Sequence, residues 1–158
     1  ADIQLDTMAP LVEDRMRALV SDGAHAVGLL CTGRFPRFEV GVPVLDPGSL
    51  LPAIAGAIAP SRRVGVVTPI ESQVDIVREI WEGDGFSVTV AVDSPYHEGG
   101  IEVAAAVMAG ARPEVVILDC MGLGPGYRDE FARLSGVPAI AAQTLLAKVA
   151  GEVAGGLS

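Results

Sequence analysis

The sequence has 158 residues, of which 50% are hydrophobic, and its mean hydropathy is +0.45, so it is long and apolar enough to bury a real core. Its 20 acidic and 11 basic residues give a net charge of −9, and only 4% of its residues are aromatic, which excludes the phosphate contacts and base stacking that nucleic-acid binding needs. Its two cysteines are too few for a secreted disulfide framework and predict a reducing, cytoplasmic setting.

The first third of the chain predicts two helices and two short strands. An amphipathic stripe predicts a helix over 7–21, and a continuous apolar run predicts a buried strand over 27–30. A second strand is expected over 42–45, followed by a helix over 50–59 with Ser49 as its N-cap. This helix is among the longest apolar stretches, and it is shorter than the roughly 20 residues that cross a bilayer, so we expect no membrane partner.

The rest of the chain repeats the alternation of strands and helices. The patterns predict strands over 63–68, 86–92, 115–119 and 137–141, and helices over 71–82, 98–111 and 143–153. The spacing of Gly122, Gly124 and Gly126 does not fit a dinucleotide-binding turn, and we interpret it as a flexible loop or lid. Apolar strands alternating with helices indicate an α/β three-layer sandwich with mostly parallel sheets, whose ligands sit beyond the carboxyl ends of the strands.

The chain also resembles itself. A helix, a Gly-Ala turn, a buried strand, a Cys-x-Gly loop, a Gly-Val-Pro strand and a helix occur in this order around Cys31 and again around Cys120. We therefore expect two pseudo-duplicated lobes, residues 1–62 with 137–158 carrying Cys31 and residues 63–136 carrying Cys120. The repeat predicts that the two cysteines face one another across a shared cleft.

Two thiols on opposite sides of a cleft suit the inversion of a carbon acid. One thiolate removes a proton from one face while one thiol returns a proton to the other, and no cofactor is needed. Free cysteine is also a common core residue, so each thiol taken alone is explained as well by packing. Only the pair, at matching places in two copies, favours catalysis.

Four stretches of this sequence resemble the AroM family, which belongs with the aspartate/glutamate racemase superfamily. They cover nearly the whole chain, and the most specific is the Leu-Asp-Cys-x-Gly segment that Tyr127-Arg128-Asp129 follows. The stretches are Leu29–Gly33, Arg63–Pro69, Val116–Gly122 and Val137–Val149. The resemblance implies a racemase-like fold and a cofactor-independent isomerase or racemase of a small carboxylate; superfamily members include amino-acid and hydantoin racemases, maleate isomerase and arylmalonate decarboxylase.

The resemblance also assigns residues. Cys31 and Cys120 match the two catalytic cysteine positions. Five further residues match loops that bind substrate carboxylates, namely Thr32, Gly33, Thr68, Met121 and Gly122, and Pro69 adjoins them in the Thr68-Pro69 strand end. Two features depart from the pattern: the family's N-terminal segment with a first strand and ligand loop has no counterpart in this sequence, and the residues after the cysteines differ from the Cys-Asn-Thr and Gly-Cys-Thr loops of amino-acid racemases.

Other readings of these residues stay open. A non-catalytic carboxylate-binding protein would keep the cleft without the chemistry, and a homodimer is compatible with either reading. Cys31 and Arg37 also fit the Cys-x5-Arg spacing of a phosphatase loop, but Pro36 removes one of the amides that such a loop needs, so Arg34 and Arg37 are better read as solvated loop residues. Pro69 is also explained as the first turn of the next helix.

No cofactor or metal is expected. The two histidines lack ligand spacing, and His97 is at most a secondary site residue. Lys148 is the only lysine, and its position in a helix makes a pyridoxal Schiff base hard to build.

Overall fold

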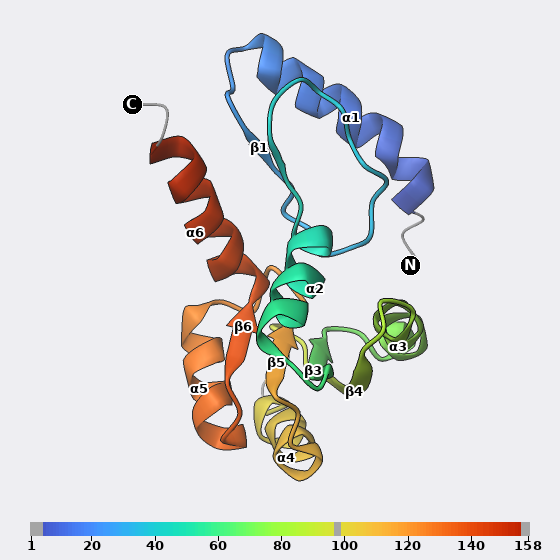
Figure 1. Ribbon diagram of the computed structural model, residues 1–158, viewed down its shortest axis with the longest axis vertical. Coiled ribbons are helices and arrows are strands. Elements are labelled where there is room, and N and C mark those ends of the chain that lie inside the picture. The colour runs from blue at the N-terminus through green and yellow to red at the C-terminus, as the bar shows by residue number, and fades with distance from the viewer. Residues whose placement is uncertain (1–4, 97–98, 156–158) are drawn as a thin grey trace.

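The computed structural model describes residues 5–96 and 99–155, in which helices and parallel strands alternate along the chain except between the first two strands (Figure 1). The elements, in chain order, are α1 (Leu5–Ser21), β1 (Val27–Gly28), β2 (Val44–Leu45), α2 (Pro47–Ile58), β3 (Arg63–Thr68), a 3₁₀ turn (Glu71–Gln73), α3 (Val74–Gly83), β4 (Ser87–Val92), α4 (Ile101–Ala111), β5 (Val115–Leu118), α5 (Pro125–Ser135), β6 (Ala139–Ala141) and α6 (Ala142–Gly155). The fold is α/β, with helices on both sides of the larger sheet, as the sequence predicts.

The larger sheet has four parallel strands in the order β4-β3-β5-β6. Val64 of β3 pairs with Val88 of β4 on one side and with Val115 of β5 on the other. Every residue of β5 is buried, because helices cover both faces of the sheet and a continuous Val, Ile and Leu run can be buried only in that setting. The carboxyl ends of these strands form one edge.

Two pairs of helices cover this sheet. Helices α2 and α3 pack on one face, where Leu51, Val66 and Trp81 share a core cluster. Helices α4 and α5 pack on the other face, where Met108 and Phe131 are fully buried against Leu118. This arrangement is the three-layer sandwich that the alternation of elements predicts.

The smaller sheet is a parallel pair, β1 with β2, and α1 covers it. Its core joins Met16 of α1 to Val27 and Leu29 and to Phe38 in the long connection between the two strands. Only Val27 and Gly28 of β1 pair with β2. The connection between these strands is irregular and contains no helix, whereas α5 occupies the corresponding connection between β5 and β6. The two copies of the repeat therefore share an order of elements, except that only the second copy has a helix between its two strands.

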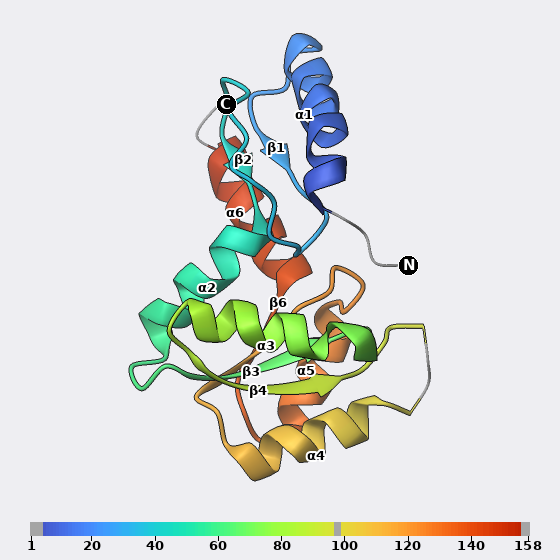
Figure 2. The same cartoon turned by 90° about the vertical axis from the view of Figure 1, so that its right-hand side faces the viewer.

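The two sheets exchange the helices that follow their last strands. Helix α2 follows β2 of the small sheet but packs on the large one, and α6 follows β6 of the large sheet but contacts β2 and α2 (Figures 1 and 2). Strand β6 pairs with β5, so residues 139–141 belong to the four-stranded sheet, although the sequence prediction grouped them with the first lobe. The division of the chain into two lobes otherwise stays a prediction.

The largest error of the sequence prediction is the glycine-rich segment. Residues 125–135 form helix α5 instead of a loop, with Pro125 in its first turn and Gly136, at φ 67°, ending it in the left-handed region. Phe131 forms the buried side of this helix. In the sequence, the glycines on either side of the helix hide its apolar spacing.

Several other elements also begin or end at residues that differ from the prediction. The N-cap of α2 is Asp46, whose side chain accepts the N–H of Gly48, and not Ser49. Helix α4 begins at Ile101, and Glu98, where it was expected to begin, lies outside the described residues. The strand expected over 27–30 pairs with β2 only at Val27 and Gly28. Within residues 5–96 and 99–155, no helix has the length and apolar character that a membrane span requires.

Candidate functional site

Cys31 and Cys120 follow equivalent strands and have the same local geometry. Both are free and half-buried, and each lies just beyond the carboxyl end of its strand, β1 or β5. The backbone N–H of Gly33 donates to Cys31 Sγ at 3.4 Å, and that of Gly122 donates to Cys120 Sγ at 3.4 Å. In each copy an amide therefore points at the sulfur, where it would stabilise negative charge.

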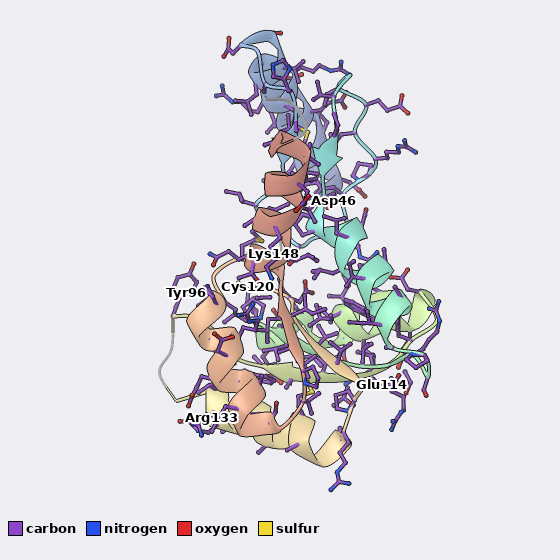
Figure 3. All side chains as sticks on the ribbon, turned by 60° about the vertical axis from the view of Figure 1, so that its left-hand side comes forward. Asp46, Tyr96, Glu114, Cys120, Arg133 and Lys148 are labelled. Carbon is purple, nitrogen blue, oxygen red and sulfur yellow. The ribbon has the colours of Figure 1, made fainter. Side chains whose placement is uncertain are left out.

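The two cysteine segments are in contact. The hydroxyl of Thr32 donates to the carbonyl oxygen of Asp119 at 3.4 Å, which ties the residue after Cys31 to the residue before Cys120. A Cβ built on Gly48, at the start of α2, would lie 2.6 Å from the Gly33 carbonyl oxygen, so this close approach requires glycine. The Cys31 segment is thus held between α2 and the edge of the large sheet where Cys120 lies. Cys120 itself lies near α6, the helix that carries Lys148 (Figure 3).

Asp119, directly before Cys120, is an ionisable group with an altered acidity. Burial raises its pKa from 3.8 to about 6, while the nearby Thr32 hydroxyl and then the positive charge of Arg34 lower it. No cation makes a hydrogen bond to this carboxylate among the interactions of the described residues. Asp119 therefore changes its charge within the range of pH in which enzymes commonly work.

This shift predicts that Asp119→Asn stabilises the protein at pH 7. Between about pH 4 and 6 the folded protein binds the Asp119 proton more tightly than the unfolded chain, so the wild type loses stability as the pH rises through this window. The variant does not titrate and should exceed the wild type by about 1–3 kcal/mol above pH 6. Urea unfolding at pH 4 and pH 7 measures the difference, which should vanish at pH 4; Asp22→Asn, at an exposed carboxylate, is the control. If the difference in stability between Asp119→Asn and the wild type were the same at pH 4 and at pH 7, the raised pKa of Asp119 would be contradicted.

The structure places the predicted ligand residues in different surroundings. Thr32 and Gly33 lie beside Cys31, and Met121 and Gly122 beside Cys120. Thr68, at the carboxyl end of β3, is only 1% exposed, and its hydroxyl donates to the side-chain oxygen of Gln73 at 3.0 Å. Pro69 is half-buried after this strand. As the chain is arranged here, the Thr68 hydroxyl is directed to Gln73, so a carboxylate could not use it without displacing this partner.

Three polar residues at the same edge of the sheet were not expected from the sequence. Asp93 follows β4, is 5% exposed, and accepts a hydrogen bond from the Tyr127 hydroxyl at 2.6 Å. Burial and then this carboxylate raise the pKa of Tyr127 above its usual range. Gln143, in the first turn of α6, donates to the Met121 carbonyl at 3.1 Å and so steadies the Cys120 loop. The position of an acidic residue directly after a predicted strand is the one signal in the sequence that could have identified Asp93.

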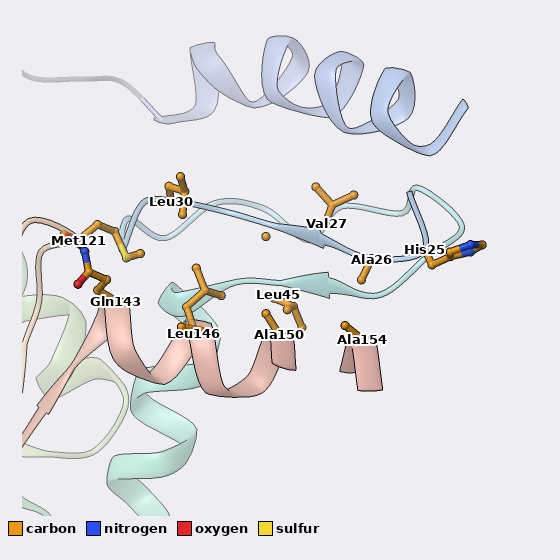
Figure 4. A pocket seen from close by; sticks show the side chains of 12 residues that line it. His25, Ala26, Val27, Leu30, Leu45, Met121, Gln143, Leu146, Ala150 and Ala154 are labelled. Carbon is orange, nitrogen blue, oxygen red and sulfur yellow. Dashed lines mark hydrogen bonds between the residues drawn. The ribbon is translucent and has the colours of Figure 1, made fainter. Parts of the chain in front are cut away.

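An apolar groove of about 630 Å³ adjoins both cysteine segments (Figure 4). Neither cysteine lines it, but Leu30, which precedes Cys31, and Met121, which follows Cys120, both do. It runs between the small sheet and α6, and it is lined by His25, Ala26, Val27, Gly28, Leu30, Leu45, Met121, Gln143, Leu146, Ala147, Ala150 and Ala154. The groove lies beside the cysteine pair and is not the site that the repeat predicts between them.

The remaining predicted residues have other surroundings. Arg37 is exposed, whereas Arg34, expected to be a solvated loop residue, pairs with Asp84. Lys148 is exposed on α6, and His97 lies outside the described residues. In the described part of the chain no three His, Cys, Asp or Glu side chains are grouped as metal ligands would be.

Comparisons with known proteins agree with this architecture. Arylmalonate decarboxylase has a similar structure, with a TM-score of 0.70 and 18% identity over 94% of this chain and 76% of that one. The allantoin racemase of Pseudomonas fluorescens has a TM-score of 0.64 and 19% identity, over 97% of this chain and 73% of the other. A glycine-to-cysteine mutant of arylmalonate decarboxylase in its sulfate-associated form has a TM-score of 0.70 and 21% identity, over 98% of this chain and 77% of that one.

These structural similarities establish a racemase-like fold. No curated protein matches the sequence. The sequence model of the AroM family, described as AroM protein, matches residues 1–154. A match over nearly the whole chain, together with the fold, shows that this protein belongs to the AroM family.

Proposed function

We propose that this protein is a cofactor-independent racemase or isomerase of a small carboxylate, with Cys31 and Cys120 as its acid/base pair. One observation carries the proposal: both thiols follow equivalent strands, both accept an N–H from the glycine two residues later, and their segments are joined by the Thr32–Asp119 hydrogen bond. A reaction on two faces of one carbon requires two equivalent groups that reach this carbon from opposite sides, and the joined segments bring both cysteines to the same part of the fold. The similarity to a decarboxylase and a racemase supports the same class of chemistry.

In the proposed reaction the thiolate of one cysteine removes the proton from the substrate's α-carbon. The C–H bond breaks, and its electron pair is delocalised into the adjacent carboxylate. The thiol of the other cysteine then delivers its proton to the opposite face, which forms the new C–H bond and leaves that sulfur as a thiolate. The two cysteines have exchanged protonation states, and both return to the starting state by exchange with water.

The amides of Gly33 and Gly122 serve both directions of this reaction. Each is positioned to stabilise its own cysteine when that sulfur carries the negative charge. Because the arrangement is the same in the two copies, either enantiomer can be the substrate.

Exchange of the substrate proton with solvent tests the proposal. Enantiopure 2-substituted carboxylates and hydantoins are incubated with the protein in deuterium oxide, and the α-proton is followed by proton nuclear magnetic resonance. The wild type is expected to remove the signal of at least one substrate class and to racemise it, and a Cys31→Ser/Cys120→Ser double variant should do neither. Exchange that persists in the double variant would show that other groups do the chemistry.

A carboxylate-binding protein without activity is the alternative outcome of this test. It would bind small dicarboxylates, raising the melting temperature by mass action, and the double cysteine variant would bind them equally well. Binding of this kind with no proton exchange across the panel would replace the racemase proposal.

A further inference from the structure

Arg34, three residues after Cys31, reaches across to the large sheet's layer of helices. Its guanidinium lies 2.5 Å from the carboxylate of Asp84, directly after α3, and the two side chains are 32% and 36% exposed. Every other ion pair in the described part of the chain joins residues one to four positions apart, whereas Arg34 and Asp84 are 50 positions apart. This pair therefore fastens a loop of the first half to the second half.

The aromatic face of Trp81 gives Arg34 a second contact. The guanidinium carbon lies 6.0 Å from the centre of the Trp81 ring, within the range of a cation–π interaction. Trp81 is only 3% exposed and is held edge-on by Phe86, with the ring centres 5.3 Å apart. Because the Trp81 ring is fixed, it orders the Arg34–Asp84 ion pair. An isolated surface ion pair lacks such a support and often contributes nothing measurable to stability.

Arg34 also acts on the Cys120 segment. Its charge lowers the pKa of Asp119, which places the guanidinium within electrostatic reach of the residue before Cys120. Thr32, two residues earlier in the same loop, contacts Asp119 directly. The Cys31 loop is thus attached to the large sheet's edge through Thr32 and to α3 through Arg34.

We propose that Arg34 is a positioning residue, whose pairing with Asp84 over Trp81 holds the Cys31 loop in place and so fixes Cys31 relative to Cys120. The evidence that Arg34 holds the loop consists of these contacts alone. The effect of Arg34 on catalysis rests on the proposed function. Arg34 is not assigned to the substrate, because its hydrogen-bonding partner is a carboxylate of the protein itself.

Amide hydrogen exchange tests the holding of the loop without any assay of activity. Arg34→Met keeps an apolar stem over Trp81 but removes the charge, and Asp84→Asn removes the partner without touching the loop. Each variant should speed exchange of the Gly33 and Phe35 amides, which donate to Cys31 Sγ and to the Gly33 carbonyl, at least threefold, while amides of the four-stranded sheet stay unchanged. The double variant should resemble either single one, because both changes break the same contact.

A matched control is Arg133→Met, which breaks an ion pair within α5 and should leave the Gly33 and Phe35 amides unaffected. Unchanged loop exchange in both Arg34→Met and Asp84→Asn would overturn the proposal. An effect of Arg34→Met without one of Asp84→Asn would overturn it as well, since the pair would then not be what holds the loop. Asp84→Asn is a mild surface change, so the test remains available even where Arg34→Met folds poorly.

Kinetics then separate positioning from substrate binding. On a substrate found by the deuterium experiment, Arg34→Met and Asp84→Asn should both lower kcat at least fivefold with KM changed less than twofold, and Arg34→Lys should recover part of the loss. A rise in KM confined to the Arg34 variants would instead make Arg34 a substrate ligand. A protein with no activity at all would contradict the proposed function and leave the hydrogen-exchange result to decide the role of Arg34.

Discussion

Single cysteine variants are expected to lose inversion and yet keep one half of the reaction. Serine is close in size to cysteine but does not ionise near neutral pH, so Cys31→Ser retains only the Cys120 thiol and Cys120→Ser only the Cys31 thiol. The remaining thiolate can still remove the α-proton from the one enantiomer whose C–H bond faces it. Each variant should therefore exchange deuterium into one enantiomer only, and the two variants should select opposite enantiomers.

The expected loss of racemisation in either variant is about 100- to 10,000-fold, which is the range for removing one general acid or base. Polarimetry measures inversion, and nuclear magnetic resonance measures exchange into each enantiomer separately. Two variants with the same enantiomer preference would show that the thiols do not lie on opposite faces of the substrate. Lys148→Met, at an exposed residue of α6, is the control for substitution as such.

Phe131→Ala should be the most destabilising single substitution in helix α5. Phe131 is fully buried in the core between α4, α5 and the large sheet, and its ring stacks on Tyr127 with the centres 6.0 Å apart. Removing it leaves a cavity, and such losses cost about 3–5 kcal/mol. Urea unfolding followed by circular dichroism measures the change, and Tyr96→Ala, at a side chain that is 86% exposed, should cost less than about 0.5 kcal/mol.

The same substitution should affect the edge of the sheet. Tyr127 holds Asp93 through its hydroxyl, so a Tyr127 ring that has lost its stacking partner orients this carboxylate less firmly. A Phe131→Ala protein as stable as the Tyr96→Ala control would show that α5 is not packed as described.

The sequence predicted most of the large sheet because its central strands, β3 and β5, are buried on both faces. The run from Arg63 to Thr68 is bounded correctly, because its valines form the short apolar run that is typical of a buried strand and Pro69 follows it directly. Helix α5 was missed because Gly124, Gly126 and Gly136 punctuate a segment whose only strongly buried large side chain is Phe131. Tertiary packing, and not local propensity, makes this segment helical.

The site was only partly predictable, because several of its contacts join residues that are far apart in the sequence. The internal repeat pointed to both cysteines, and the contact between Thr32 and Asp119 brings their segments together. The roles of Arg34 and Asp84 depend on a contact between residues 50 positions apart, which no spacing in a single sequence encodes. Thr68 matched a ligand position in sequence, but its hydroxyl is engaged by Gln73, a partner that only the folded chain reveals.

The exchange of α2 and α6 has a consequence for how this protein folds. The large sheet gains one of its covering helices from residues 47–58, which precede it in the chain, and the small sheet gains α6 from the chain's other end. Neither half can finish its core before distant segments meet, and such late, long-range contacts slow folding. Thermal and chemical melting are therefore expected to occur as one transition, in which the two cysteine segments form and separate together.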